Sequence, residues 1–421
     1  MRICVTKKNT NRLVLPAKKL VLVLVLFALL VLTILASGFF KEGVAFADSK
    51  IDGKNKNAEE ELSKLIEELL SRLDIKPLDS FVKSLDGEAG QFLSIDGLKD
   101  ALKLLIDGKG DNFFERLFNM LGGVVGKYFL SFLPSFLTIL IICVLKSMLS
   151  GLTADFLDNS TTEVVHIVLY AGIITILMTG VVKVLTVVTG TISAISAFAE
   201  ATFPVLMTLL SAVGGVTTVA TYSPMLALLS NGIIALVSKI IVPAFIAVVV
   251  FSVVGNLSKT VKLDKLTHLV KTVSTWIIGV VFGLFATFLT AQGIAGGVVD
   301  KFGFNVAKFA FSSYVPILGG YLSDGFDLIS ASVVIVKNAF GYFAVVTLVA
   351  TIVFPLLKIM AFSLTLRFVA AIVEPIGDER VAKLLHSLAE NMNLLITALA
   401  GLGFLFFILL MLMIGSCNMG V

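Results

Sequence analysis

The pattern of apolar and polar residues changes sharply at about Tyr128. From there to the C-terminus the chain consists of apolar stretches separated by short polar loops. An α-helix needs about 20 apolar residues to cross the hydrocarbon core of a bilayer. Backbone polar groups must be satisfied internally in lipid, so stretches of this length predict helices. We therefore expect an all-α, polytopic transmembrane protein.

Charged residues, glycines and prolines divide residues 128–421 into six to eight expected spans. The clearest are 128–149, 164–182, 226–254, 272–292 and 394–414. Two further stretches contain a proline beside an ionisable residue. We expect 184–213 to be a broken or re-entrant helix, and 338–373 to be either one kinked helix or two short ones.

Residues 1–47 have the form of a secretory signal peptide. A basic segment precedes the apolar run from Leu20 to Phe40, and Ala45-Phe46-Ala47 fits a cleavage site. Cleavage would make Asp48 the first residue of the mature chain. The alternative is an uncleaved first helix, because the apolar run is long for a signal peptide.

Residues 48–127 form the one sizeable polar region, which a signal peptide would export. Leucines and an isoleucine recur there at helical spacing, with Glu and Lys on the other face: Leu62, Leu65, Ile66, Leu69, Leu70 and Leu73. Few other bulky apolar residues are present. We expect a set of extracytoplasmic docking helices rather than an independent enzyme domain.

Composition supports a membrane location and weakens any link to nucleic acid. Hydrophobic residues make up 57% of the chain and charged residues 15%, whereas soluble domains carry about 25% charged residues. The formal charge of +4 resides in the signal, because the chain after residue 47 holds 26 basic and 28 acidic residues. We expect the lipid bilayer, and no nucleic acid, as a partner.

The distribution of lysines predicts the orientation. The loop 256–271 contains Lys259, Lys262, Lys265 and Lys271, so the positive-inside rule places it in the cytoplasm. An exported segment ending at residue 127 then requires an odd number of crossings before this loop. Three crossings meet that requirement if 184–213 does not cross fully.

Ionisable residues inside membrane segments are the candidate functional positions, because burying a charge in lipid is costly. Glu200 is the strongest candidate. It could hold a proton or cation or line a pore; alternatively it has a structural role, at an interface or paired with Lys183 or Lys239. Lys239 and Arg367 are further candidates, and we expect Arg367, like Lys146 and Lys358, to snorkel or to form pairs.

Residues 314–327 combine a proline, paired glycines and two aspartates three residues apart. Asp324 and Asp327 would share a helix face and could give a cation two oxygen ligands. A re-entrant hairpin with helix-capping aspartates is the other interpretation, and the one we favour. GxxxG patterns at 279–283 and 293–297 suit close helix packing, although they arise easily by chance in glycine-rich spans.

Catalytic motifs are missing from the sequence. The three histidines lie in no metal-ligand cluster, and the chain contains neither a phosphate-binding P-loop nor a GxSxG nucleophile turn. The three cysteines form no CxxC motif. We expect no enzyme activity, no catalytic residues, no metal and no cofactor.

Three stretches carry a resemblance to a known family: FAEATFPVLMTLLSAVGG, TAQGIAGGVVDKFGFNVAKFAFSSYVPILGGYLSDGFD and VEPIGDERVAKLLHSLAENM. Together with the order of signal, exported segment and membrane region, they resemble the stage III sporulation protein AE family of endospore-forming bacteria. The resemblance implies a multi-pass protein of the mother cell membrane that surrounds the forespore. It implies as partners the other stage III A proteins and, in the opposing membrane, stage II sporulation protein Q.

The resemblance also implies a function. Such proteins belong to a channel-like complex across the two membranes that sustains forespore development. We expect a non-enzymatic component that serves as conduit or assembly platform. The rival is a stand-alone secondary transporter with a proton or cation site near Glu200 and Asp324/Asp327; the chain shows no internal repeat of the kind many transporters contain.

Overall fold

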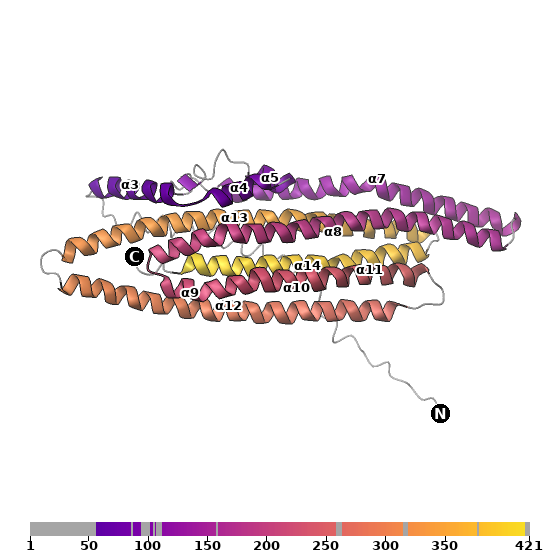
Figure 1. The fold of residues 1–421 in the computed structure, drawn as a ribbon. Helices are drawn as coiled ribbons and strands as arrows, with labels where there is room; N and C mark the ends of the chain where they lie inside the picture. The colour runs from indigo at the N-terminus through magenta and orange to yellow at the C-terminus, as the bar shows by residue number, and fades with distance from the viewer. Residues whose placement is uncertain are drawn as a thin grey trace, which may run out of the picture.

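The helices run antiparallel and form one elongated bundle (Figure 1). This computed structural model describes residues 56–85, 87–93, 102–103, 106, 112–156, 159–257, 263–314, 319–376 and 379–416. The expected signal peptide and its cleavage before Asp48 lie outside the described residues.

Three short helices precede the long ones: α3 Lys56–Arg72, α4 Lys76–Ser84 and α5 Gly87–Leu93. The long helices are α7 Asn112–Phe156, α8 Asn159–Ala212, α12 Asp264–Tyr314, α13 Gly319–Val373 and α14 Glu379–Gly415, with a 3₁₀ turn η4 at Glu374–Ile376. Between α8 and α12 the chain forms a nearly continuous helix made of α9 Val216–Ala227, η2 Leu228–Ile233, α10 Ile234–Leu236, η3 Val237–Ile241 and α11 Val242–Leu257.

Six of these helical segments are long and apolar enough to cross a membrane within the described part of the chain. They agree with the lower end of the expected number. Three of them precede the lysine-containing loop at 256–271, and three is an odd number, as the predicted orientation requires. The reason differs from the expected one, since residues 164–182 and 184–212 belong to the single helix α8.

The expectation of a broken or re-entrant helix at 184–213 is wrong. Helix α8 continues through Pro204, and α13 continues through Pro355, so 338–373 is one helix and not two. Breaking a helix among apolar side chains would leave several amide and carbonyl groups without partners. A proline inside a continuous helix leaves only one carbonyl without its amide partner, which costs less free energy than breaking the helix.

Two wide π-helical turns interrupt the segment between α9 and α11. The second, η3, ends two residues before Pro243 and contains Lys239. Proline has no amide hydrogen for the carbonyl four residues earlier, which here belongs to Lys239, and its ring crowds that carbonyl. A π turn widens the helix at this point and relieves the contact.

Helix α14 is the central helix of the bundle. Its buried side chains extend from Val381 to Ile414, and α11, α12 and α13 pack around it. Glycines allow these close approaches. A Cβ atom on Gly401 would stand 2.4 Å from the Phe282 ring of α12, and one on Gly403 would stand 2.5 Å from Ile352 of α13.

The GxxxG pattern at Gly279 and Gly283 has no such role within the chain. Both glycines are exposed, and a Cβ on either would meet nothing within 4 Å. Gly279 and Gly283 are therefore not among the glycines that pack helices tightly within the chain.

Helices α3, α4 and α5 lie along α8 and α13 (Figure 1). Phe81 of α4 meets Phe198 edge-on with ring centroids 5.8 Å apart, and Phe92 of α5 lies 6.2 Å from the Phe354 ring. The three short helices thus pack directly against the long ones. The boundary expected between residues 127 and 128 lies inside the continuous helix α7.

Candidate functional site

The most connected ionisable group in the described part of the chain is Glu88 of α5. Its side chain is 8% exposed. Tyr128 donates its hydroxyl hydrogen to Oε2, Lys127 Nζ donates to Oε1 at 3.1 Å, and Lys358 Nζ of α13 lies 3.3 Å from Oε2. The Lys358 ammonium also lies 4.8 Å from the centroid of the Tyr128 ring. One carboxylate thus joins α5 to both α7 and α13.

The surroundings keep Glu88 ionised. Burial on its own raises the pKa of a carboxyl group. Here the hydrogen bonds from Tyr128 and Lys127, with the positive charge of Lys358, outweigh burial and hold the pKa of Glu88 at about 2. At neutral pH the cluster is therefore charged and holds α5 against α7 and α13, and its carboxylate does not exchange protons.

Local backbone geometry brings Glu88 into place. Gly87 has φ +70°, a left-handed conformation that glycine adopts without strain, and it begins α5 directly before Glu88. The same α5 surface buries Ala89, Phe92 and Leu93 against Val346 and Phe354 of α13. The prediction that Lys358 forms a pair is confirmed; its partner Glu88 was not singled out from the sequence.

Glu200, the leading sequence candidate, lies on the outer face of α8. It is exposed, and Ser196 one turn earlier donates a hydrogen bond to it at 3.5 Å. Among the described residues it forms no ion pair with Lys183 or Lys239, so the expected pairing is not found. A single copy of the chain does not enclose this carboxylate.

The other candidates are also separated from one another. Lys239 is exposed in the π turn η3, and Arg367 is half-buried on α13. Asp324 and Asp327 lie in the second and third turns of α13, because that helix begins at Gly319. Neither aspartate caps the helix, so the capping role expected for them is wrong. Their side chains lie outside the described residues.

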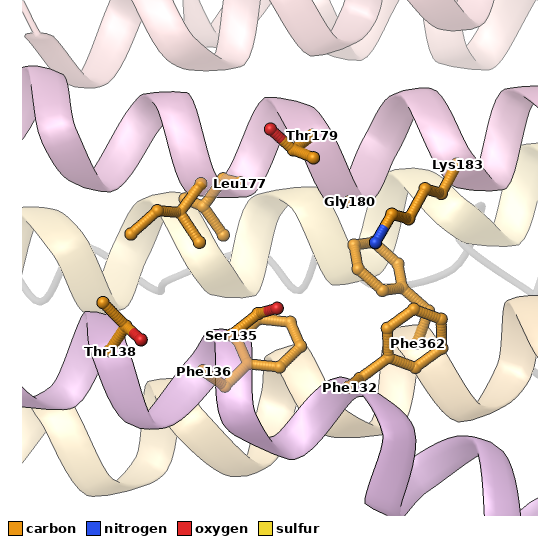
Figure 2. Close-up of a pocket in the computed structure, with 10 residues that line it drawn as sticks. Phe132, Ser135, Phe136, Thr138, Leu177, Thr179, Gly180, Lys183 and Phe362 are labelled. Carbon is orange, nitrogen blue, oxygen red and sulfur yellow. The ribbon is translucent and has the colours of Figure 1, made fainter.

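A cavity of about 260 Å³ separates part of α7 from α8 (Figure 2). Lys183 extends its amino group towards the phenylalanine rings, and the hydroxyl-bearing residues Ser135, Thr138 and Thr179 also line the space. Gly180 forms part of the wall, where an added Cβ would stand 2.7 Å from the Phe362 ring of α13. The cavity contains one cation and no carboxylate.

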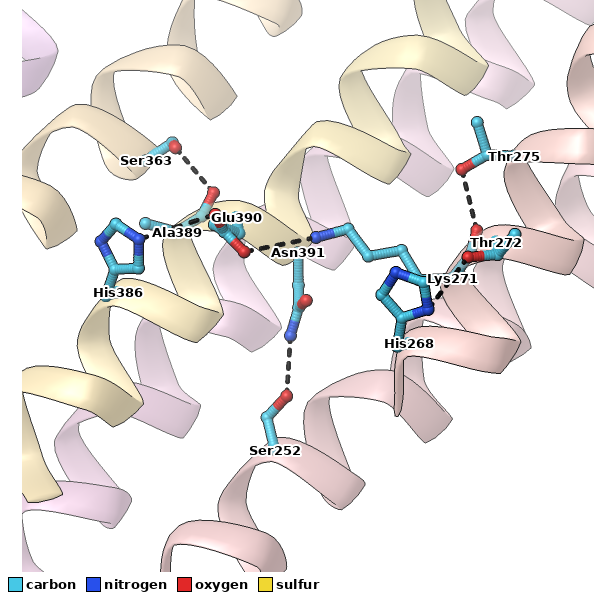
Figure 3. A network of polar contacts seen from close by, with 10 residues as sticks. All are labelled: Ser252, His268, Lys271, Thr272, Thr275, Ser363, His386, Ala389, Glu390 and Asn391. Carbon is cyan, nitrogen blue, oxygen red and sulfur yellow. Dashed lines mark hydrogen bonds and ion pairs between the residues drawn. The ribbon is translucent and has the colours of Figure 1, made fainter. Parts of the chain in front are cut away.

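A polar network joins α11, α12, α13 and α14 near the lysine-containing loop (Figure 3). Asn391 donates to the Ser252 hydroxyl at 2.9 Å, and Ser363 donates to the Ala389 carbonyl at 2.9 Å. Lys271 Nζ lies 3.8 Å from Glu390. Buried hydrogen bonds of this kind fix the relative position of packed helices.

His386 is a further member of this network, and its Nε2 lies 3.6 Å from Glu390 on the same helix. His268 meets only the Thr272 hydroxyl, at 3.4 Å, among the contacts of this network (Figure 3). In the described parts of the chain, no group of three or more His, Cys, Asp or Glu residues is placed to hold a metal ion.

Asp300 of α12 has a structural role that sequence reasoning missed. It is buried and accepts hydrogen bonds from the backbone amides of Thr217 at 3.0 Å and Thr218 at 2.7 Å. These amides begin α9, whose own N-cap Gly215 has no side chain to offer. Burial acts to raise the pKa of Asp300, but the hydrogen bonds from Thr217 and Thr218 outweigh it and lower the pKa.

Comparison with known proteins identifies the chain. A family model described as stage III sporulation protein AE matches residues 97–417. The chain belongs to this family. It is also 24% identical over 287 residues to the stage III sporulation protein AE of Bacillus subtilis (strain 168), covering 68% of this chain and 71% of that protein. No solved structure matches.

Membership of the stage III sporulation protein AE family implies a role in sporulation. The match includes Lys127, Tyr128 and Lys358 of the Glu88 cluster but begins after α5, so Glu88 itself lies outside it. The expected resemblance over nearly the whole length thus holds for the membrane helices, and the match does not extend to α3, α4 and α5.

Proposed function

We propose that this chain is a membrane component of the complex that joins mother cell and forespore during endospore development, and that it acts as an assembly platform or as part of a conduit. It resides in the mother cell membrane around the forespore. Its partners are the other stage III A proteins and, directly or indirectly, stage II sporulation protein Q in the opposing membrane. The role is not enzymatic.

The packing of α14 is the observation that supports this proposal best. The helix is buried along nearly its whole length, and glycines seat it against α12 and α13. Side chains thus fill the axis where a pore within one copy would run. A conduit would therefore form between copies or between this chain and its partners, which is the role of a platform.

The secondary transporter remains the alternative, and the placement of its candidate residues argues against it. Such a site needs carboxylates gathered around a cavity near the middle of the bundle. Glu200 is exposed on the outside of α8, while the cavity beside α8 contains Lys183. Asp324 and Asp327 lie near the N-terminal end of α13.

Deletion of the gene in a spore-forming host tests the proposal. We expect engulfment to finish and forespore development to stop afterwards, with loss of late forespore-specific gene expression. Re-expression of the chain in the mother cell should restore both, whereas re-expression in the forespore should not. Normal spore formation without the chain would contradict the proposal.

A further inference from the structure

The helices are too long for one bilayer. Helix α8 has 54 residues, which corresponds to about 80 Å at 1.5 Å per residue. The hydrocarbon core of a bilayer is only about 30 Å thick. Either the chain tilts steeply, or a large part of the bundle lies outside the lipid.

Most of the exposed large apolar side chains in the described residues lie in one part of the bundle. We call this region the apolar belt; its exposed residues are Leu130, Leu137, Ile141, Val144, Leu145, Met148, Ile167, Val168, Val182, Ile240, Ile246, Val250, Val254, Leu266, Leu269, Val273, Trp276, Val280, Leu284, Phe288, Met360, Leu364 and Phe368. Four other large apolar side chains are exposed in the described residues, and they lie outside the belt: Val216, Leu228, Val306 and Ile329.

Contacts between the helices show that these residues form one belt. Phe132 of α7 lies 5.1 Å from Phe362 of α13, and Gly180 of α8 meets the same ring. The belt therefore stands at one level on α7, α8 and α13. Asn391 and Ala389 of α14 connect the α11 part of the belt to α13 through the network of Figure 3.

The height of the belt fits a bilayer. On α7 it extends from Leu130 to Met148, about 28 Å along the helix, and on α12 from Leu266 to Phe288, about 33 Å. These lengths bracket the roughly 30 Å of a hydrocarbon core. A lysine follows the belt's edge on three helices: Lys127 on α7, Lys183 on α8 and Lys239 in η3, and all three are exposed.

Beyond this edge the exposed face of α8 changes from large apolar residues to small and polar ones. From Lys183 to Ala212 no large apolar side chain of α8 is exposed. The outer face there presents small and polar residues instead: Thr186, Thr189, Ser193, Ala197, Glu200, Thr208 and Ser211. A helix face in contact with lipid would present apolar side chains.

Helix α3 gives independent evidence that this half of the bundle lies outside the lipid. It packs against α13 at the end of the bundle where α8 ends (Figure 1). Its outer face exposes charged groups along its length: Glu61, Lys64, Glu67, Glu68 and Arg72. Five charges cannot lie in hydrocarbon, because each costs several kcal/mol even with relaxation. Water must therefore reach the face of the bundle that α3 covers.

We propose that phospholipid surrounds only the apolar belt, that Lys127, Lys183 and Lys239 mark its outer edge, and that the rest of the bundle projects into water. The projecting part includes α8 beyond Lys183, a length of about 45 Å, together with α3, α4 and α5. The projecting part lies on the opposite side of the bilayer from the lysine-containing loop at 256–271. This proposal does not depend on the sporulation role.

Spin labels measure the position of the bilayer directly. The chain, without its native cysteines, is placed in nanodiscs that hold one copy each, made of phosphatidylethanolamine and phosphatidylglycerol. A single cysteine carries a nitroxide at Ser193 or Thr208 on the projecting face, or at the matched belt positions Leu137 and Val250. Collision rates with oxygen, which concentrates in lipid, and with a water-soluble nickel chelate are then compared.

We expect oxygen collisions to dominate at Leu137 and Val250 and nickel collisions to dominate at Ser193 and Thr208. The ratio of the two rates should reverse between Val182 and Thr186 along α8. Oxygen-dominated collisions at Ser193 and Thr208, equal to those at Leu137, would overturn the proposal. The matched belt positions show that the chain inserts into these nanodiscs under the same conditions.

Discussion

The Glu88 carboxylate lies 3.3 Å from the Lys358 ammonium, and this ion pair connects helix α5 to the middle of α13. The two residues are 270 positions apart in the sequence. The pair lies close to Leu130, the first exposed residue of the apolar belt on α7, because Tyr128 and Lys127 complete the cluster. The docking of α5 therefore involves a charged pair beside the edge of the apolar belt.

Replacing Glu88 by leucine should detach α5. The change leaves Lys358 and Tyr128 without their carboxylate, and breaking a buried pair from one side costs about 3–5 kcal/mol. We expect residues 56–93 to become sensitive to protease in nanodiscs. Asp79→Asn is the control, because it removes only the exposed pair with Lys83, which contributes about 0–1 kcal/mol.

A double replacement distinguishes the effect of an unpaired charge from the effect of altered side-chain packing. If the uncompensated Lys358 causes the loss, Glu88→Leu combined with Lys358→Leu should recover much of the protease resistance, since both charges are then gone. Equal sensitivity of Glu88→Leu and wild type would show that the cluster does not hold α5 in place.

Acid should release the same helices only at very low pH. Folding lowers the pKa of Glu88 from 4.5 to about 2, so its contribution is complete above about pH 4.5 and is lost as the pH falls towards 2. Protease resistance of residues 56–93 should thus stay constant between pH 7 and about pH 5. A loss of resistance between pH 7 and pH 6 would contradict this assignment.

Helix packing around α14 should be intolerant of a methyl group at Gly401. A Cβ there would stand 2.4 Å from the Phe282 ring, and overpacking costs about 1–3 kcal/mol. Gly401→Ala should lower the thermal unfolding midpoint in detergent. Gly279→Ala, with open space around the added atom, should leave it unchanged or raise it; similar losses for both variants would argue against this packing.

Glu200→Gln should preserve protein level, assembly and spore formation. The carboxylate is exposed and bonded only to Ser196 among its described contacts, so an amide of equal size can replace it. Complete loss of sporulation, with normal accumulation and normal complex formation, would reveal a proton or cation site and favour the transporter.

Two cysteines test the proposed orientation. In a chain without Cys143 and Cys417, a cysteine at Ser63 of α3 should react with an impermeant maleimide added outside intact cells whose engulfment is blocked. A cysteine at Ser258, in the lysine-containing loop, should react only after the cells are opened. Equal labelling of the two positions would refute the orientation.

The sequence was a good guide to the helices and a poor one to their contacts. Apolar stretches of the right length predicted helical spans, because lipid leaves the backbone no other choice. Prolines misled the prediction at 184–213, since a proline inside apolar surroundings costs less than a broken helix. Local patterns report on local structure, and Pro204 acts within its own turn.

Functional contacts were harder to foresee because they join distant segments. Asp300 caps a helix 83 residues before it, and Glu88 meets Lys358 across most of the chain. Both pairs join residues far apart in the sequence, so no local sequence pattern indicates either contact. Glu200 stood out for its apolar neighbours along the chain, yet the fold turns its side chain outward; the exposed polar face of α8 was visible only in three dimensions.

Chemical crosslinking in sporulating cells tests the central claim most directly. A tagged copy of the chain, crosslinked after engulfment and purified from the membranes, should carry the other stage III A proteins and stage II sporulation protein Q in one assembly. The same purification from vegetative cells that express the tagged chain alone should lack them. Recovery of the chain from sporulating cells only as a monomer or as an oligomer of itself would contradict the platform role.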